Sequence, residues 1–170
     1  SVSSLRPRSC RFIMRGRARK VLAATNFTSS TAGTWFWPPA SCAGALPSSG
    51  AGGTVSGSNV GATKEPGEPN HAANAGGASV WYRWTAPATG LATVNTCGSS
   101  FDTTLAAYTG ASVNALTEVA ANDDSWFGCP TPFVTQSNIS FLAVAGVTYA
   151  IAVDGFDGAT GNVQLAWTIG

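Results

Sequence analysis

Helical patterning, charge and long apolar runs are all scarce in this 170-residue sequence, and each scarcity excludes a class of protein. Charged residues make up only 10% of the chain, against about 25% in an average soluble domain, which excludes a coiled coil or a helical bundle with a salt-bridged surface. No apolar run reaches the roughly 18 residues of a transmembrane helix, so no membrane insertion is expected. The best helical segment, residues 112–116, is at most one turn long. These absences favour an all-β protein.

Basic residues are almost absent from the body of the chain. Residues 21–170 carry two positive and eight negative charges, a net of −6, and the two positive residues are Lys64 and Arg83. A groove for nucleic acid needs many phosphate contacts and cannot be built from two cations, so no nucleic-acid partner is expected. The other seven basic residues form an N-terminal arm: Arg6, Arg8, Arg11, Arg15, Arg17, Arg19 and Lys20.

The sequence changes character near Gly53. Residues 1–52 read as the basic arm followed by a linker rich in Ser, Gly and Pro, which we expect to be loop with at most one strand at residues 35–39. Residues 53–170 show short β-type runs separated by turn residues, the pattern of a β-sandwich domain. The expected strands are 53–60, 78–86, 90–97, 103–108, 116–121, 133–143, 147–154 and 161–169.

The sequence has four cysteines, no Cys-x-x-Cys pair and a single histidine, which argues against a zinc site. An even number of cysteines in a chain with almost no lysine suggests an exported, oxidised protein, although four buried thiols are the alternative. Of the three possible pairings we favour Cys97–Cys129, which would attach the loop at 122–132 to the sheet. That pairing leaves Cys10–Cys42 as a second bridge between arm and linker.

No constellation of catalytic residues is present. His71 is the sole histidine, it follows a proline-rich loop with no nucleophile signal, and no Gly-x-Ser-x-Gly motif occurs. We expect His71 to be a hydrogen-bonded loop residue that orders residues 65–74. A glycosidase needs two carboxylates at a set separation, and nothing in the sequence singles out one pair. The sequence therefore predicts no enzyme activity.

The acidic residues, apart from Glu118, lie at strand ends or in loops. Calcium takes six to eight oxygen ligands from carboxylates, Asn side chains and carbonyls, and loops at one end of a sandwich can supply them. Asp and Asn also cap turns through their own side chains, which explains the same placement without a metal. None of the spacings matches an EF-hand loop, so both interpretations stay open.

The six tryptophans divide into two groups. Trp81, Trp84 and Trp167 lie in expected strands and are assigned to the core. The others lie in loop-like contexts, where an exposed ring can stack on a sugar or a partner protein, or can act as a lid over the core. These candidate ligand-binding residues are Trp35, Trp37 and Trp126.

From about residue 53 to 169 the sequence resembles the bacterial pre-peptidase C-terminal domain-like family. The matching stretches are 57–71 (GSNVGATKEPGEPNH), 79–87 (SVWYRWTAP), 97–103 (CGSSFDT), 121–124 (ANDD) and 149–156 (YAIAVDGF). The resemblance implies a jelly-roll-like antiparallel β-sandwich in a secreted or surface protein, non-catalytic, with relatives that bind calcium, fibrous protein or polysaccharide. On that basis the candidate metal ligands are Glu65, Glu68, Asp102, Asp123, Asp124 and Asp154. The basic arm has no counterpart in the family.

The resulting prediction is an extracellular or cell-surface binding or adhesion module, with Ca²⁺ as the one candidate cofactor ordering its loops. Its expected partner is a protein or polysaccharide surface. One alternative is a structural subunit that self-assembles into a surface polymer or filament through the N-terminal arm. The other is a carbohydrate-binding module that uses the exposed tryptophans.

Overall fold

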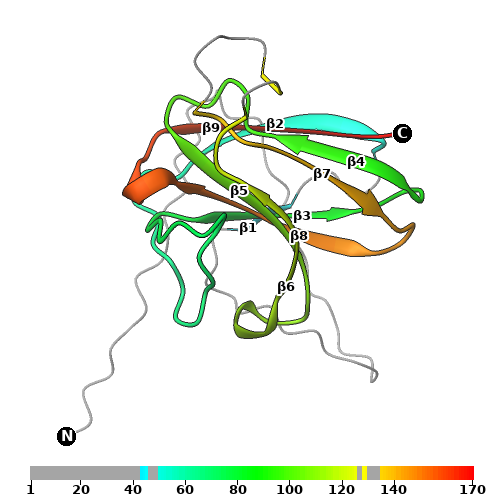
Figure 1. Cartoon of the computed structure of the whole chain (residues 1–170), viewed down its shortest axis with the longest axis horizontal. Coiled ribbons are helices and arrows are strands. Elements are labelled where there is room, and N and C mark those ends of the chain that lie inside the picture. Colours follow the sequence, from blue (N-terminus) through cyan, green and yellow to red (C-terminus); the bar gives the residue numbers. More distant parts are fainter. Residues whose placement is uncertain (1–42, 46–49, 126–127, 130–134) are drawn as a thin grey trace, which may run out of the picture.

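The computed structural model describes residues 43–45, 50–125, 128–129 and 135–170, and shows a sandwich of two β-sheets (Figure 1). One sheet has the strand order β1-β3-β8-β5-β6 and the other β2-β9-β4-β7. All pairs are antiparallel except β1 with β3. The strands are β1 (Ala43–Ala45), β2 (Gly52–Ser58), β3 (Val80–Thr85), β4 (Gly90–Asn95), β5 (Thr103–Thr109), β6 (Thr117–Asn122), β7 (Asn138–Ala143), β8 (Thr148–Gly155) and β9 (Asn162–Ile169).

The strand order from β2 to β9 is that of a jelly roll. Every connection in this range crosses from one sheet to the other, except the β5–β6 hairpin, which stays within its sheet. Two Greek keys wrapped into two four-stranded sheets give this order, and β1 extends one of the sheets at the β3 edge. The all-β, jelly-roll-like fold class is confirmed.

All eight strands expected from the sequence are present, with boundaries shifted by a few residues. The largest shift is at β7, which begins at Asn138 rather than at residue 133. The one-turn helical segment is a 3₁₀ turn at Val113–Ala115. The short strand β1 was not expected, because a three-residue Ala-Gly-Ala segment has no alternating pattern and is recruited only by the edge of β3.

The core lies between the sheets, and a smaller apolar cluster covers the outer face of the β3-β8-β5 sheet. Trp84 and Trp167 are fully buried in the core, as predicted. On β3 the neighbours Trp81 and Tyr82 point to opposite faces and are both buried, Trp81 in the outer cluster with Tyr108. A central strand covered on both faces explains why its sequence, VWYRWT, has bulky side chains at successive positions.

Within the described part of the chain, no helix is long and apolar enough to cross a membrane.

Candidate functional site

Three strand ends meet at one end of the five-stranded sheet, because β5 runs antiparallel to both of its neighbours. Thr103, the first residue of β5, is in register with Gly155 at the end of β8, and Leu105 is in register with Asn122 at the end of β6. Side chains just before β5 and just after β6 and β8 are therefore brought together. The sequence has acidic residues at all three places: Asp102, the pair Asp123 and Asp124, and Asp157.

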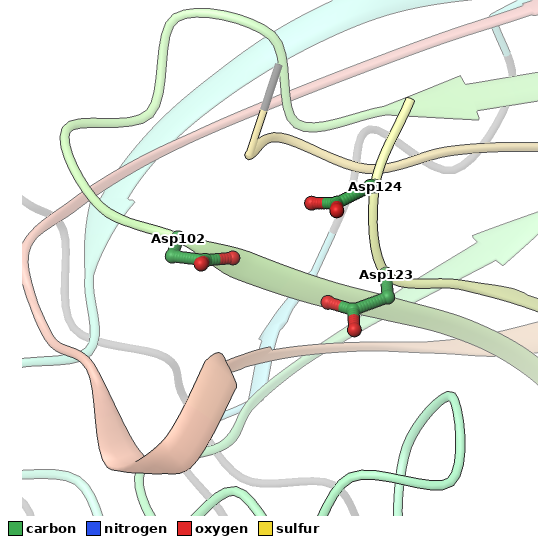
Figure 2. Close-up of side chains that lie close together, drawn as sticks. All are labelled: Asp102, Asp123 and Asp124. Atoms are coloured by element: carbon green, nitrogen blue, oxygen red, sulfur yellow. The ribbon is translucent and has the colours of Figure 1, made fainter. Parts of the chain in front are cut away.

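Asp102, Asp123 and Asp124 form an acidic cluster, which we call the aspartate end of the sandwich. One carboxylate oxygen from each of the three lies within 4.8 Å of the others. Figure 2 shows the three carboxylates pointing toward a common space from the loop before β5 and the loop after β6. The Oδ1 atoms of Asp102 and Asp123 are buried and have no hydrogen-bond partner among the described residues.

The environment of the cluster disfavours its negative charge. Burial raises the pKa of the Asp102 carboxyl, and the charges of Asp123, Asp124 and Asp157 raise it further. Burial likewise raises the pKa of Asp123, together with the charges of Asp124 and Asp157. Carboxylates that are buried beside one another and lack donors are destabilised in their ionised form, and a bound cation would relieve this.

Asp157 is held beside the cluster in a strained backbone conformation. Its φ is +48°, in the left-handed region that non-glycine residues seldom adopt. Its N–H donates to Asn74 Oδ1 at 3.1 Å, and Asn74 Nδ2 lies 3.4 Å from Asp157 Oδ1. The loop before β3 and the turn after β8 are thus joined at the aspartate end.

A buried hydroxyl network and a disulfide fix the loop that carries Asp123. The Ser137 hydroxyl lies 2.5 Å from the Thr103 carbonyl oxygen and 2.6 Å from the Asp123 carbonyl oxygen. Cys97 and Cys129 form a disulfide with a Cα–Cα distance of 5.4 Å. This confirms the favoured pairing, and it ties the loop between β6 and β7 to the end of β4. Cys10 and Cys42 lie outside the described residues.

Asp154, one of the six expected metal ligands, is turned away from the cluster and caps backbone instead. Its carboxylate is fully buried and accepts hydrogen bonds from the N–H groups of Gly77, Ala78 and Gly155 at 2.8–3.2 Å. A Cβ at Gly76, where φ is +57°, would overlap this carboxylate. Asp154 therefore anchors the loop before β3, which is the turn-capping role that the sequence left open.

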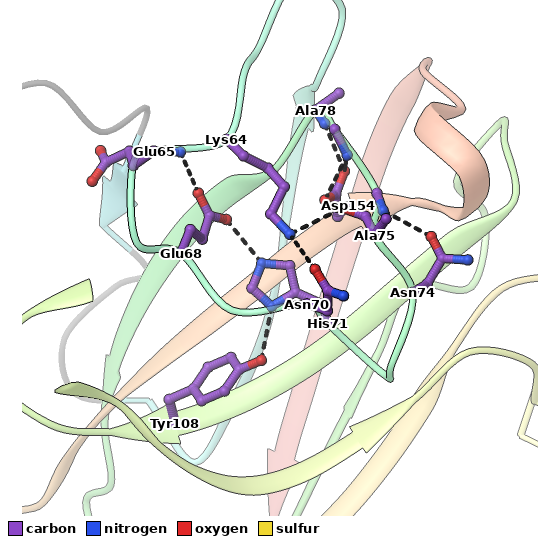
Figure 3. Close-up of polar contacts among 12 residues, drawn as sticks. Lys64, Glu65, Glu68, Asn70, His71, Asn74, Ala75, Ala78, Tyr108 and Asp154 are labelled. Carbon is purple, nitrogen blue, oxygen red and sulfur yellow. Dashed lines mark hydrogen bonds and ion pairs between the residues drawn. The ribbon is translucent and has the colours of Figure 1, made fainter. Parts of the chain in front are cut away.

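Glu68 belongs to a second polar group, on the outer face of the sheet (Figure 3). Its Oε1 lies 2.9 Å from His71 Nε2, and both side chains are fully buried. His71 Nδ1 lies 2.8 Å from the Tyr108 hydroxyl, and its ring packs edge-on against Trp81 at 5.2 Å between centroids. A tautomer with its proton on Nε2 satisfies both contacts, since it donates to Glu68 and accepts from Tyr108. The expectation that His71 orders its loop through hydrogen bonds is confirmed.

The carboxyl groups of Glu65 and Glu68 experience opposite pKa shifts. Burial raises the pKa of Glu68, but the hydrogen bonds from His71 and from the Glu65 N–H help to outweigh it and leave the pKa below its ordinary value. Burial and the charge of Glu68 raise the pKa of Glu65. Glu68 thus holds its loop on the sheet face, and the acidic cluster of Asp102, Asp123 and Asp124 contains neither glutamate.

Sequence reasoning therefore named all three residues of the aspartate end and did not single out its neighbour Asp157. Asp154 and Asp157 both stand at the end of β8 and carry the same signal in the sequence. Only the direction in which each side chain points separates the capping residue from the neighbour of the cluster. The expected aromatic ligand-binding residues Trp35, Trp37 and Trp126 lie outside the described residues.

Comparison with known proteins finds similar chains among the solved structures. No family model and no curated protein matches the chain. The crystal structure of PliG from Aeromonas hydrophila, a periplasmic inhibitor of g-type lysozyme, is similar to it at 16% identity and a TM-score of 0.44, over 75% of this chain and 96% of that one. At this level of similarity the likeness assigns neither a ligand nor a partner to this chain.

Proposed function

We propose that this protein is a non-catalytic extracellular binding module whose loops at the aspartate end are ordered by a calcium ion. The observation that carries the proposal is the pair of buried Oδ1 atoms of Asp102 and Asp123, which have no partner among the described residues and face Asp124. Buried polar atoms are usually satisfied, so two unpartnered carboxylate oxygens that lie in one cluster support the proposal of a bound ligand there. Because the three donors are all carboxylates, a hard cation such as Ca²⁺ fits them.

The roles of the three aspartates follow from their positions. Asp102 precedes β5, and Asp123 and Asp124 follow β6, so an ion held by all three would join the two loops. Calcium supplies positive charge that offsets the repulsion among the carboxylates. Backbone carbonyls and water complete its coordination in protein sites of this kind. Loops fixed in this way present a rigid end of the sandwich to a protein or polysaccharide surface.

Two further features support a non-catalytic, exported module. His71, the only histidine of the sequence, is fully buried between Glu68 and Tyr108 and cannot reach a substrate. The Cys97–Cys129 disulfide is typical of an oxidising compartment. The resemblance to the pre-peptidase C-terminal domain-like family, whose relatives include calcium-binding and adhesive modules, points to the same proposal.

A thermal melt tests the metal site. We expect the full chain in 1 mM calcium to melt about 5–11 °C higher than in excess chelator if calcium is at about 100 times its dissociation constant. Asp123→Asn should lose most of this shift. Glu118→Gln, which removes an exposed carboxylate from β6 outside the cluster, should keep it. No shift in the wild type, or an equal shift in Asp123→Asn, would contradict the proposal.

A further inference from the structure

The edge of β7 is not protected in the ways that sheet edges usually are. β7 pairs with β4 on one side, and the described residues place no strand on its other side. Natural edges are commonly blunted by charged residues, proline or a bulge, because unpaired N–H and C=O groups invite another strand. β7 has the sequence NISFLA, with no charged residue and no proline, and its register with β4 is regular.

The hydrogen-bond alternation shows which backbone groups of β7 point outward. In an antiparallel pair, alternate residues direct both backbone groups at the neighbouring strand, and the residues between them direct theirs away. The Thr96 N–H donates to the Ser137 carbonyl at 2.9 Å, so Ser137 directs its backbone groups toward β4. Counting along the strand, residues 139, 141 and 143 do the same. Ser140 and Leu142 therefore direct their N–H and C=O groups away from β4.

The partner strand shows the same alternation. Leu91, which is in register with Leu142, exchanges both of its backbone hydrogen bonds with Gly170, at 2.8 and 3.1 Å. Leu91 thus faces β9 rather than β7. Leu91 and Leu142 are consequently a non-hydrogen-bonded pair, in which side chains approach most closely.

The two ends of the edge are already occupied within the chain. The Asn138 N–H donates to Asn122 Oδ1 at 3.1 Å, and the Val144 N–H donates to the Tyr149 hydroxyl oxygen at 3.0 Å. No described group pairs with the outward backbone groups of Ser140 and Leu142. The open edge therefore consists of two residues, with two donors and two acceptors.

The most exposed leucines of the described chain lie at this same edge. Leu142 is 70% exposed and Leu91, beside it on β4, is 57% exposed. The outer face of the four-stranded sheet around them has no charged side chain, since none of β2, β4, β7 and β9 contains one. An open edge, an adjacent apolar pair and an uncharged face occur together on a body that is otherwise acidic.

We propose that two copies of this chain pair through β7, antiparallel and edge to edge, around a twofold axis at Phe141. Only this register brings together groups that are all free, because Ser140 of each copy then faces Leu142 of the other. A twofold axis at Ser140 would oppose Leu142 to Asn138, whose N–H is already bonded to Asn122. A twofold axis at Leu142 would oppose Ser140 to Val144, whose N–H is likewise taken.

Side chains favour a second copy as the occupant, and charge does not oppose it at this edge. Two bodies that each carry a net charge of −6 over residues 21–170 repel each other over most orientations, and contact through an uncharged edge keeps that repulsion small. In the proposed register the two Leu142 side chains are diagonal neighbours, about 7–8 Å apart between Cα atoms. They would join the two Leu91 side chains in one apolar strip across the interface.

Sedimentation equilibrium of the full chain tests the proposal, at about 10 µM to about 1 mM, a range that captures weak association. We expect the wild type to approach twice the 17.2 kDa monomer mass. Leu142→Lys, which places two charges near the axis, should remain monomeric. The matched control Val60→Lys changes a residue that is 67% exposed and follows β2, at the opposite edge of this sheet, and it should dimerise as the wild type does.

Amide hydrogen exchange separates this interface from any other route to a dimer. The Ser140 and Leu142 amides should exchange at least tenfold more slowly at high than at low concentration, and this protection should be absent in Leu142→Lys. A wild type that stays monomeric throughout the range overturns the proposal. So does a dimer that survives Leu142→Lys or leaves these two amides unprotected, as assembly through the N-terminal arm would.

Discussion

Glu68 Oε1 lies 2.9 Å from His71 Nε2, and neither side chain is accessible to solvent. The pair fastens the loop between β2 and β3 onto the outer sheet face, where His71 also contacts Tyr108 and Trp81. A buried carboxylate is tolerated only when it is hydrogen-bonded, so this loop depends on the contact.

Glu68→Gln should lower the free energy of unfolding at neutral pH by about 1–3 kcal/mol, because it replaces a charged hydrogen bond with a neutral one. The folded-state pKa of Glu68 lies below its ordinary value of 4.5. Its stabilisation is therefore present above pH 4.5 and is lost as the pH falls through the folded-state pKa. Urea unfolding from about pH 7 to about pH 3 should show a shallower acid loss in the variant. An unchanged pH profile would contradict the assignment.

Asp102→Asn should stabilise the calcium-free protein. The folded-state pKa of Asp102 is raised above its ordinary value of 3.8, so stability falls as the pH rises through that range and the loss is complete at neutral pH. Removing the charge should recover a few tenths to about 1 kcal/mol at pH 7 in chelator, since solvent screens the repulsion. Calorimetry should find no such gain below pH 3.8. A variant less stable than the wild type at neutral pH would contradict the prediction that the charge of Asp102 destabilises the calcium-free protein.

Asp154→Asn should destabilise the protein without changing its response to calcium. The carboxylate accepts hydrogen bonds from three backbone N–H groups, and an amide in its place presents one oxygen and an NH₂ that cannot accept. We expect a loss of about 2–4 kcal/mol. Denaturant unfolding gives the loss, and paired melts in calcium and chelator give the response. A lost calcium shift in a folded variant would place Asp154 in the metal site instead.

Ala73→Gly should stabilise the turn that follows His71. Ala72 and Ala73 have φ values of +51° and +62°, and the Asn74 N–H donates to the His71 carbonyl at 3.0 Å across them. The left-handed conformation costs a non-glycine residue about 1–2 kcal/mol. Glycine avoids this cost, but it lowers stability by about 0.4–1 kcal/mol because it increases the conformational entropy of the unfolded chain. The net gain should be a few tenths to about 1 kcal/mol in urea unfolding. Ala75→Gly, at a position without positive φ, should be destabilising.

Replacing Cys97 and Cys129 together by serine should cost roughly 3–4 kcal/mol in the chain-entropy model for a bridge that closes about 30 residues. The double substitution leaves Cys10 and Cys42 in place, so it isolates this bridge better than a reducing agent does. Denaturant unfolding of the variant and the wild type measures the difference. A loss below about 1 kcal/mol would mean that the loop between β6 and β7 is fixed mainly by the Ser137 network.

The periodicity of the sequence was enough to place the eight strands of the sandwich and its core tryptophans. Alternation with a period of two depends only on which side chains face inward, so it is legible in β9, where Val163, Leu165 and Trp167 are buried and the residues between them are not. The same logic fails at β1, whose Ala-Gly-Ala segment has no alternating pattern and nevertheless pairs with β3. It also fails to place the start of β7, because the carbonyls of residues 135–137 accept hydrogen bonds from three different segments, the N–H groups of Thr103, Ser125 and Thr96, and form no regular ladder with β4.

The candidate site divides in the same way. The sequence by itself determined that the acidic residues stand at strand ends, because turns and their polar residues are local features, and it only favoured Cys97–Cys129 among three possible pairings. Only the tertiary structure decided which carboxylates meet. Asp102 and Asp123 converge because β5 begins where β6 ends. Asp154, at the neighbouring end of β8, turns toward the backbone of Gly77 and Ala78 instead, since a side chain's direction depends on contacts distant in sequence.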